Sequence, residues 1–123
     1  MEKELSCQIF KSIVEQDRQP IVVCDPGHTI LYLNPAAKAR YKRDLVGSSI
    51  LDCHNSTSCA RIQEVVEWFQ KSPDNNVIFT YHYDKENKDI YMVALRDESG
   101  HLIGYYEKHE CKDPETAPGY DLK

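Results

Sequence analysis

The sequence lacks several features that would place it in familiar classes. Its aliphatic runs are short, as in Ile21–Cys24, so it has no stretch of about 20 apolar residues that could span a bilayer. No apolar segment of a signal peptide follows its charged N-terminus. It also has no Gly-rich phosphate loop, no Gly-x-Ser-x-Gly turn and no His-Glu-x-x-His pair. We therefore expect a cytoplasmic protein that does not bind membranes and is not an enzyme.

Positive charge is also scarce. The chain has 15 Lys and Arg against 20 Asp and Glu, for a net charge of −5. The basic residues are dispersed apart from residues 38–43, which are typical of a solvated helix face. Nucleic-acid binding needs a basic surface that replaces the counterions of phosphate, so we expect no nucleic-acid partner.

Paired cysteine motifs are absent as well. Five cysteines are present, an odd number, and no two of them form a Cys-x-x-Cys pair. This disfavours both a disulfide framework and a structural zinc site, and it favours free thiols. The five histidines are scattered too, and only Cys53-His54 places a thiol beside an imidazole.

What the chain does have is enough apolar material for one folded domain. Of its 123 residues, 41% are hydrophobic, which suffices for a single core without a metal or a disulfide. Residues 3–17 have the period of an amphipathic helix, with an apolar stripe made by Leu5, Ile9, Phe10, Ile13 and Val14.

The remaining pattern alternates between strands and helices. Asn34 and Pro35 mark the start of a helix, as N-cap and first helical residue. Short helices are expected through residues 35–41 and 42–47, and a long helix through 59–71, capped by Ser56 or Ser58. Strands are expected over residues 21–24, 29–33, 77–83, 89–96 and 101–109. The prediction is an α+β fold with a five-stranded antiparallel sheet covered by helices on one face.

Four segments in this order resemble the PAS sensor family. They are Ile21–Asp25 with Gly27, the Ile30–Ala37 stretch that contains Asn34, the Leu45–Asp52 passage around Gly47, and the hairpin Tyr91–Gly104. The passage Asp52-Cys53-His54-Asn55 is similar to a bacterial PAS subgroup with Cys-His-Asn or Cys-His-Pro before the long helix. The resemblance implies the order β-β-α-α-α-β-β-β. It assigns residues 1–18 to an N-terminal flanking helix, 19–111 to the PAS domain, and 112–123 to a loose tail.

The resemblance also implies a signal-transduction sensor with a small-ligand or cofactor pocket between the long helix and the sheet. The candidate pocket residues are His54, Cys53, Ile62, Val66, Ile78 and Met92. Haem is the leading specific ligand, with His54 as the axial ligand to iron. We expect a homodimer through the N-terminal helix and the sheet, and a downstream signalling protein as a further partner.

Two alternatives remain open. The chain is either a ligand-free module for dimerisation and protein interaction, or it holds a metal through Cys53, His54 and Cys59, with His109 and Cys111 as further ligands. Alternation along residues 77–83 puts Ile78, Thr80 and His82 on one face and Phe79, Tyr81 and Tyr83 on the other. At the end of the last strand, His109 and Cys111 share the parity of Tyr105 and either flank a ligand or face solvent, and we expect them to face solvent.

Overall fold

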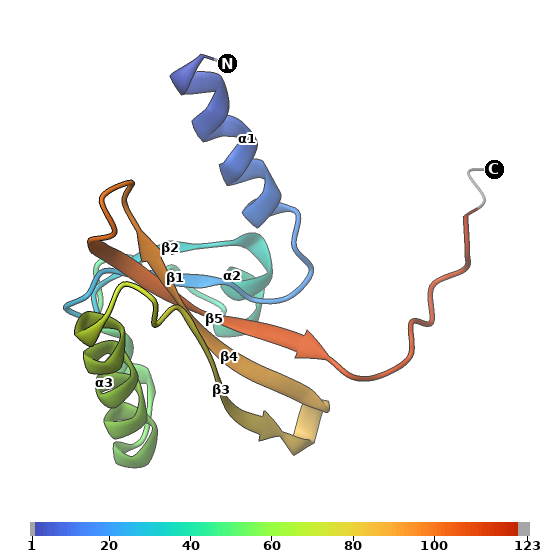
Figure 1. Ribbon diagram of the computed structural model, residues 1–123. Coiled ribbons are helices and arrows are strands. Elements are labelled where there is room, and N and C mark those ends of the chain that lie inside the picture. Colours follow the sequence, from blue (N-terminus) through green and yellow to red (C-terminus); the bar gives the residue numbers. More distant parts are fainter. Residues whose placement is uncertain (1, 121–123) are drawn as a thin grey trace.

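The computed structural model describes residues 2–120, and its centre is one antiparallel sheet (Figure 1). The strands are β1 (Val22–Cys24), β2 (Ile30–Leu33), β3 (Val77–Tyr83), β4 (Lys88–Arg96) and β5 (Leu102–Cys111). Their order in the sheet is β2-β1-β5-β4-β3, so the first hairpin pairs with the last strand. The predicted five-stranded antiparallel sheet is therefore confirmed.

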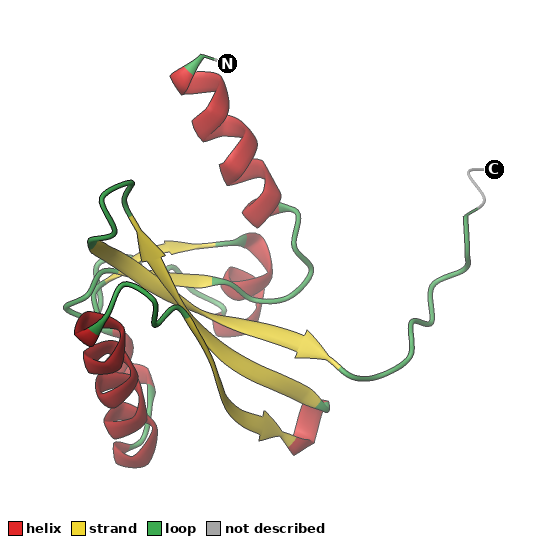
Figure 2. Cartoon of the chain, viewed as in Figure 1, coloured by secondary structure: helices red, strands yellow, loops and turns green. Residues whose placement is uncertain are grey.

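Helices precede, interrupt and cover this sheet (Figure 2). They are α1 (Lys3–Glu15), α2 (Pro35–Tyr41) and α3 (Ser56–Lys71), with the short 3-10 helices η1 (Ile50–Cys53) and η2 (Asp84–Glu86). The core lies between the sheet and α3, which buries Ile62, Val65, Val66 and Phe69. No helix within residues 2–120 is long and apolar enough to cross a membrane.

Two local predictions were wrong. Residues 42–47 form turns instead of a second short helix, because Lys42 ends α2 at φ 60 and Gly47 has φ 92, both in the left-handed region. The N-cap of α3 is Asn55, not Ser56 or Ser58, and its side chain accepts a hydrogen bond from the backbone N–H of Ser58 at 2.9 Å.

Asn34 connects three elements at the start of α2. Its Oδ1 accepts hydrogen bonds from the N–H groups of Ala37 (3.0 Å), in α2, and Ile21 (2.9 Å), next to β1. Its Nδ2 donates to the carbonyls of Val14, Asp17 and Gln19, at 3.1, 3.3 and 3.0 Å, where α1 ends. The side chain is fully buried. One amide thus fixes α1, β1 and α2 relative to one another.

A β-bulge at Thr80 changes which face of the sheet the end of β3 presents. Phe79 pairs with Tyr91 and Tyr81 pairs with Ile90, so Thr80 has no partner in the register. Its hydroxyl donates to the Ile90 carbonyl at 2.9 Å instead. Beyond the bulge the alternation is shifted by one residue. The prediction that Tyr81 shares a face with Phe79 was therefore wrong.

The apolar stripe of α1 is mostly uncovered. Only the C-terminal part of the helix reaches the sheet, where Val14 lies near Val23 and the Tyr32 hydroxyl donates to Glu15. Phe10 and Ile13 are 62% and 63% exposed. Figure 1 shows α1 projecting from the domain, on the side away from α3.

The chain beyond β5 contains neither helix nor strand from Lys112 to Tyr120. Arg18 forms an ion pair with Glu115 at 3.0 Å, and both side chains are exposed. The last part of the expected tail, residues 121–123, lies outside the described residues.

Removing the Asn34 amide should destabilise the whole domain. Asn34→Ala leaves buried N–H and C=O groups without partners, so we expect a loss of about 3 kcal/mol in the free energy of unfolding. Asn55→Ala is the matched control, because Asn55 is an exposed N-cap with one hydrogen bond and should cost about 1 kcal/mol. Urea denaturation measures both. Equal losses would show that the Asn34 network carries no extra stability.

Candidate functional site

A polar concavity, an open groove of about 390 Å³, lies where α2, η1 and the start of α3 face the ends of β3, β4 and β5. Its volume lies at the lower end of the range for small-molecule sites, which is roughly 300–1,000 Å³. Eleven residues line it: Arg40, Tyr41, Cys53, His54, Asn55, Ser58, Tyr81, Tyr83, Ile90, Glu107 and His109. We refer to this feature as the groove.

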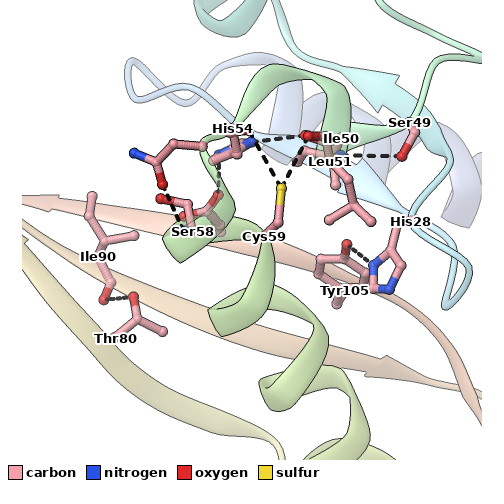
Figure 3. Close-up of polar contacts among 12 residues, drawn as sticks. His28, Ser49, Ile50, Leu51, His54, Ser58, Cys59, Thr80, Ile90 and Tyr105 are labelled. Atoms are coloured by element: carbon pink, nitrogen blue, oxygen red, sulfur yellow. Dashed lines mark hydrogen bonds and ion pairs between the residues drawn. The ribbon is translucent and has the colours of Figure 1, made fainter.

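Capping hydrogen bonds fix the corner between η1 and α3, which carries His54 (Figure 3). The Ser49 hydroxyl accepts from the N–H of Leu51 at 3.2 Å and starts η1. The Cys59 thiol, one turn into α3, donates to the Leu51 carbonyl at 3.2 Å. Nδ1 of His54 lies 2.9 Å from the Ile50 carbonyl, an acceptor, so Nδ1 is the protonated nitrogen. The imidazole is thereby held with Nε2 directed away from η1.

Nε2 of His54 faces the carboxylate of Glu107 on β5. The distance from Nε2 to Oε1 is 3.7 Å, and both side chains are about four-fifths buried, at 21% and 18% exposure. The Glu107 carboxylate favours the imidazolium and raises the pKa of His54, while burial opposes this effect. The Ile50 carbonyl adds to the increase.

Two groups in the groove have unused hydrogen-bonding capacity. Within residues 2–120, the Glu107 carboxylate makes one ion pair and no hydrogen bond shorter than 3.5 Å. Nδ1 of His109 is buried and has no hydrogen-bond partner in the described part of the chain. Burial lowers the pKa of His109, so its ring is neutral near pH 7. The prediction that His109 faces solvent was wrong, whereas Cys111 is exposed as expected.

Aromatic rings form the side of the groove next to β3. Tyr81 and Tyr83 reach it because of the bulge at Thr80, and Tyr41 lies opposite at the end of α2. The guanidinium of Arg61 lies 4.6 Å from the centre of the Tyr81 ring and covers one of its faces.

The second cation of this region, Arg40, is already neutralised. Its guanidinium binds both oxygens of Glu86, at 2.9 and 2.8 Å. Glu86 also pairs with Lys88 at 3.5 Å, and hydrogen bonding to Arg40 lowers the pKa of Glu86 to about 2.

The structure brings together some of the residues predicted from sequence. His54 and Cys53 both line the groove. Ile62 and Met92 border a separate space of about 10 Å³ between α3 and the sheet, which is at the limit for a single water. Val66 is buried in the core, and Ile78 packs against it. The interior between α3 and the sheet is therefore filled by side chains, and the open volume lies at its edge.

Sequence reasoning named His109 only as a further metal ligand or a residue at the end of the last strand, and it did not assign Glu107, Tyr81 or Tyr83 to the site. Glu107 and His109 share the parity of buried Tyr105, and that signal was present in the sequence. Tyr81 and Tyr83 gave no such signal, because alternation without a bulge assigns them to the opposite face.

Metal ligands do not converge here. Within residues 2–120, no group of three or more Cys, His, Asp or Glu side chains is arranged to hold a metal ion. The Cys59 thiol is directed to the Leu51 and His54 carbonyls, at 3.2 and 3.5 Å.

Replacing the Glu107 carboxylate should lower the pKa of His54. In Glu107→Gln the imidazolium loses its anionic partner, and an NMR titration of the His54 ring should show the shift. A histidine whose pKa is raised by folding stabilises the fold below its unfolded pKa, and this stabilisation is lost as pH rises through the folded value. The variant should therefore lose more stability at about pH 5.5 than at about pH 8.

The control is Glu110→Gln, which removes a carboxylate that pairs with Lys108 and Lys112 instead. This change should leave the His54 titration unaltered. An unchanged pKa of His54 in Glu107→Gln would contradict the pairing.

Comparison with known proteins identifies the fold of this chain. No protein-family model matches the sequence, and no curated protein matches it. Solved structures do match, and one is a C-terminal domain from Streptococcus mutans, with 20% identity, a TM-score of 0.64, and coverage of 85% of this chain and 84% of that one. The PAS domain of Bordetella pertussis BvgS has 15% identity, a TM-score of 0.61 and coverage of 89% and 88%. A PAS domain from Colwellia psychrerythraea has 12% identity, a TM-score of 0.65 and coverage of 86% and 96%. With the observed strand order and helices, these matches show that the chain has the PAS fold.

Proposed function

We propose that this chain is a sensory module that binds a small polar ligand in the groove and passes the bound state to α1. The observation that carries the proposal is the groove itself. It has the volume of a ligand site and two polar groups, on Glu107 and His109, with unused hydrogen-bonding capacity. The PAS domains among the similar structures support a signalling role. We propose binding and no catalytic step.

Helix α2 supports the second half of this proposal, because it touches both the groove and α1. Arg40 and Tyr41, at its C-terminal end, line the groove. Asn34, which caps its N-terminal end, donates to the Val14 carbonyl of α1 and to the Asp17 and Gln19 carbonyls just after that helix. The helix has 7 residues, so a displacement at one end moves the other as a rigid unit. A ligand that shifts Tyr41 would thus alter the attachment of α1.

Haem bound through His54 is the alternative occupant. Nδ1 of His54 donates to a carbonyl, an arrangement common for metal-binding histidines, and Nε2 is then the atom available to iron. However, the Glu107 carboxylate already faces Nε2 at 3.7 Å. Only about 10 Å³ is free between α3 and the sheet. The residues present thus fit a small polar ligand in the open groove better than a haem.

The exposed apolar surface favours a second role in protein contact, and we propose a homodimer through it. Its members on the outer face of the sheet are Leu31, Val77, Phe79 and Ile103, and α1 adds Leu5, Ile9, Phe10 and Ile13. Surfaces of this kind mark interaction sites. The α1 stripe and the outer face lie on the same side of the domain, so a second copy can cover both.

Filling the groove should abolish ligand binding without unfolding the domain. Ser58 is half-buried in the wall of the groove, and Ser58→Leu adds bulk there. Ser56→Leu, on the exposed side of the same helical turn, is the matched control. We expect fragments of mixed charge, and any small molecule that co-purifies, to bind wild type and Ser56→Leu but to bind Ser58→Leu at least tenfold more weakly. NMR shift perturbation and native mass spectrometry measure this.

Equal binding to all three proteins would contradict the groove as the site. Added haem distinguishes the alternative occupant. A Soret band that disappears in His54→Ala would favour haem over a small polar ligand.

A charged residue on the outer face of the sheet should dissociate the proposed dimer. Phe79 is 53% exposed and packs against Tyr91 with the two rings tilted, so Phe79→Glu places a carboxylate on the apolar surface. Val46→Glu is the control, since Val46 is 50% exposed in the loop after α2. Light scattering should give a dimer for wild type and Val46→Glu and a monomer for Phe79→Glu. A wild-type monomer at all concentrations would contradict the dimer.

A further inference from the structure

The charged groups of the groove indicate which charge the ligand must carry. Among the charged groups there, Arg40 is neutralised by Glu86 with two short hydrogen bonds. Nδ1 of His54 is spent on the Ile50 carbonyl. The hydroxyl groups of Tyr41, Tyr81, Tyr83 and Ser58 also line the groove, but they are neutral donors. The lining residues therefore offer a carboxylate or a phosphate no unpaired cation.

Acceptor capacity, in contrast, is plentiful. A carboxylate accepts about four hydrogen bonds, and Glu107 makes a single ion pair at 3.7 Å, longer than a hydrogen bond. Its side chain is 18% exposed and borders the open groove, so the missing bonds are left to water or to a ligand. His109 adds a buried ring nitrogen with no partner within residues 2–120. A carboxylate that lacks a hydrogen-bond donor is satisfied best by a charged N–H donor.

The aromatic side chains that line the groove also favour a positively charged group. Tyr41 and Tyr83 present aromatic rings to the groove, and the faces of such rings attract cations. One face of Tyr81 is already covered by a cation of the protein itself, the guanidinium of Arg61 at 4.6 Å. Ile90 supplies an apolar patch for the body of a small molecule.

We propose that the groove binds a small primary amine, whose ammonium group donates to Glu107 while its apolar or aromatic body lies against Tyr41 and Tyr83. This inference rests on the proposed function, because it names the ligand class of the same site. A primary amine has N–H groups for the carboxylate, whereas a quaternary ammonium has none.

Binding of the amine should compete with protonation of His54. The imidazolium and the ammonium both favour the Glu107 carboxylate, so binding should lower the pKa of His54. By linkage, affinity should increase as pH rises and His54 loses its proton. The other groups facing Glu107 and His54 are Arg40 and Tyr41 on α2, Cys53 on η1, Arg61 on α3, Tyr81 and Tyr83 on β3, and His109 on β5. Of these, burial lowers the pKa of His109 and raises the pKa of Tyr41 and Tyr81. Hydrogen bonding to Glu86 raises the pKa of Arg40.

The test uses four matched probes on the full chain, followed by NMR. They are benzylammonium, benzyltrimethylammonium, benzyl alcohol and benzoate, which share a ring and differ in charge and donor capacity. We expect benzylammonium to bind at least tenfold more tightly than the other three, and Glu107→Gln to reduce its affinity by tenfold or more. Its affinity should rise between about pH 5.5 and about pH 8, and its binding should lower the pKa of His54.

Any other result contradicts a primary amine as the ligand of the groove. Tighter binding of benzoate or benzyl alcohol in the groove would reject the amine and leave the proposed function standing. Preference for the trimethylated probe would reject the hydrogen bond to Glu107. If no probe shifts groove resonances, the amine is rejected, and the comparison of Ser58→Leu with Ser56→Leu across the wider fragment set decides the proposed function separately.

Discussion

The buried amide of Asn34 is the interaction on which the rest of the structure depends. Its oxygen begins α2 and anchors the chain at Ile21, and its nitrogen lies among three carbonyls at the end of α1. A hydrophobic side chain of similar size would bury these backbone groups without partners, which is costly in a packed interior. The position of α1 relative to β1 and α2 therefore depends on this one residue.

Helix α2 connects Asn34 to the groove. The helix places Tyr41 and Arg40 at the far end, where they meet β3 and η2. The groove is polar because β5 contributes Glu107 and His109 on the same face as the buried Tyr105. The apolar surface lies on the opposite side of the sheet, around Phe79. The two faces are thus chemically separate: one suits a small ligand, and the other suits a protein.

Much of this fold follows from local sequence patterns. Asn34-Pro35 predicted the start of α2, and apolar periodicity predicted α3 and the strands to within a few residues. Prediction was wrong at the Thr80 bulge, because the extra residue is set by pairing with β4 and not by the strand's own pattern. The three carbonyls bound by Asn34 Nδ2 were also beyond sequence reasoning, since they depend on where α1 ends in space. In the site, Cys53-His54 was visible in the sequence, but its partner Glu107, 53 residues after His54, was not.

The most direct test of the central claim, that the groove and α1 are coupled through α2, is amide hydrogen exchange with and without a groove-bound molecule. The amides to follow are those of Gln16 and Asp17, which bond the carbonyls of Ser12 and Val14 in the last turn of α1. With benzylammonium as the probe, we expect exchange at these amides to change together with that of the groove residues, and Asn34→Ala to remove the change at α1 only. A change confined to the groove in the wild-type protein, with Gln16 and Asp17 unaffected, would contradict the coupling.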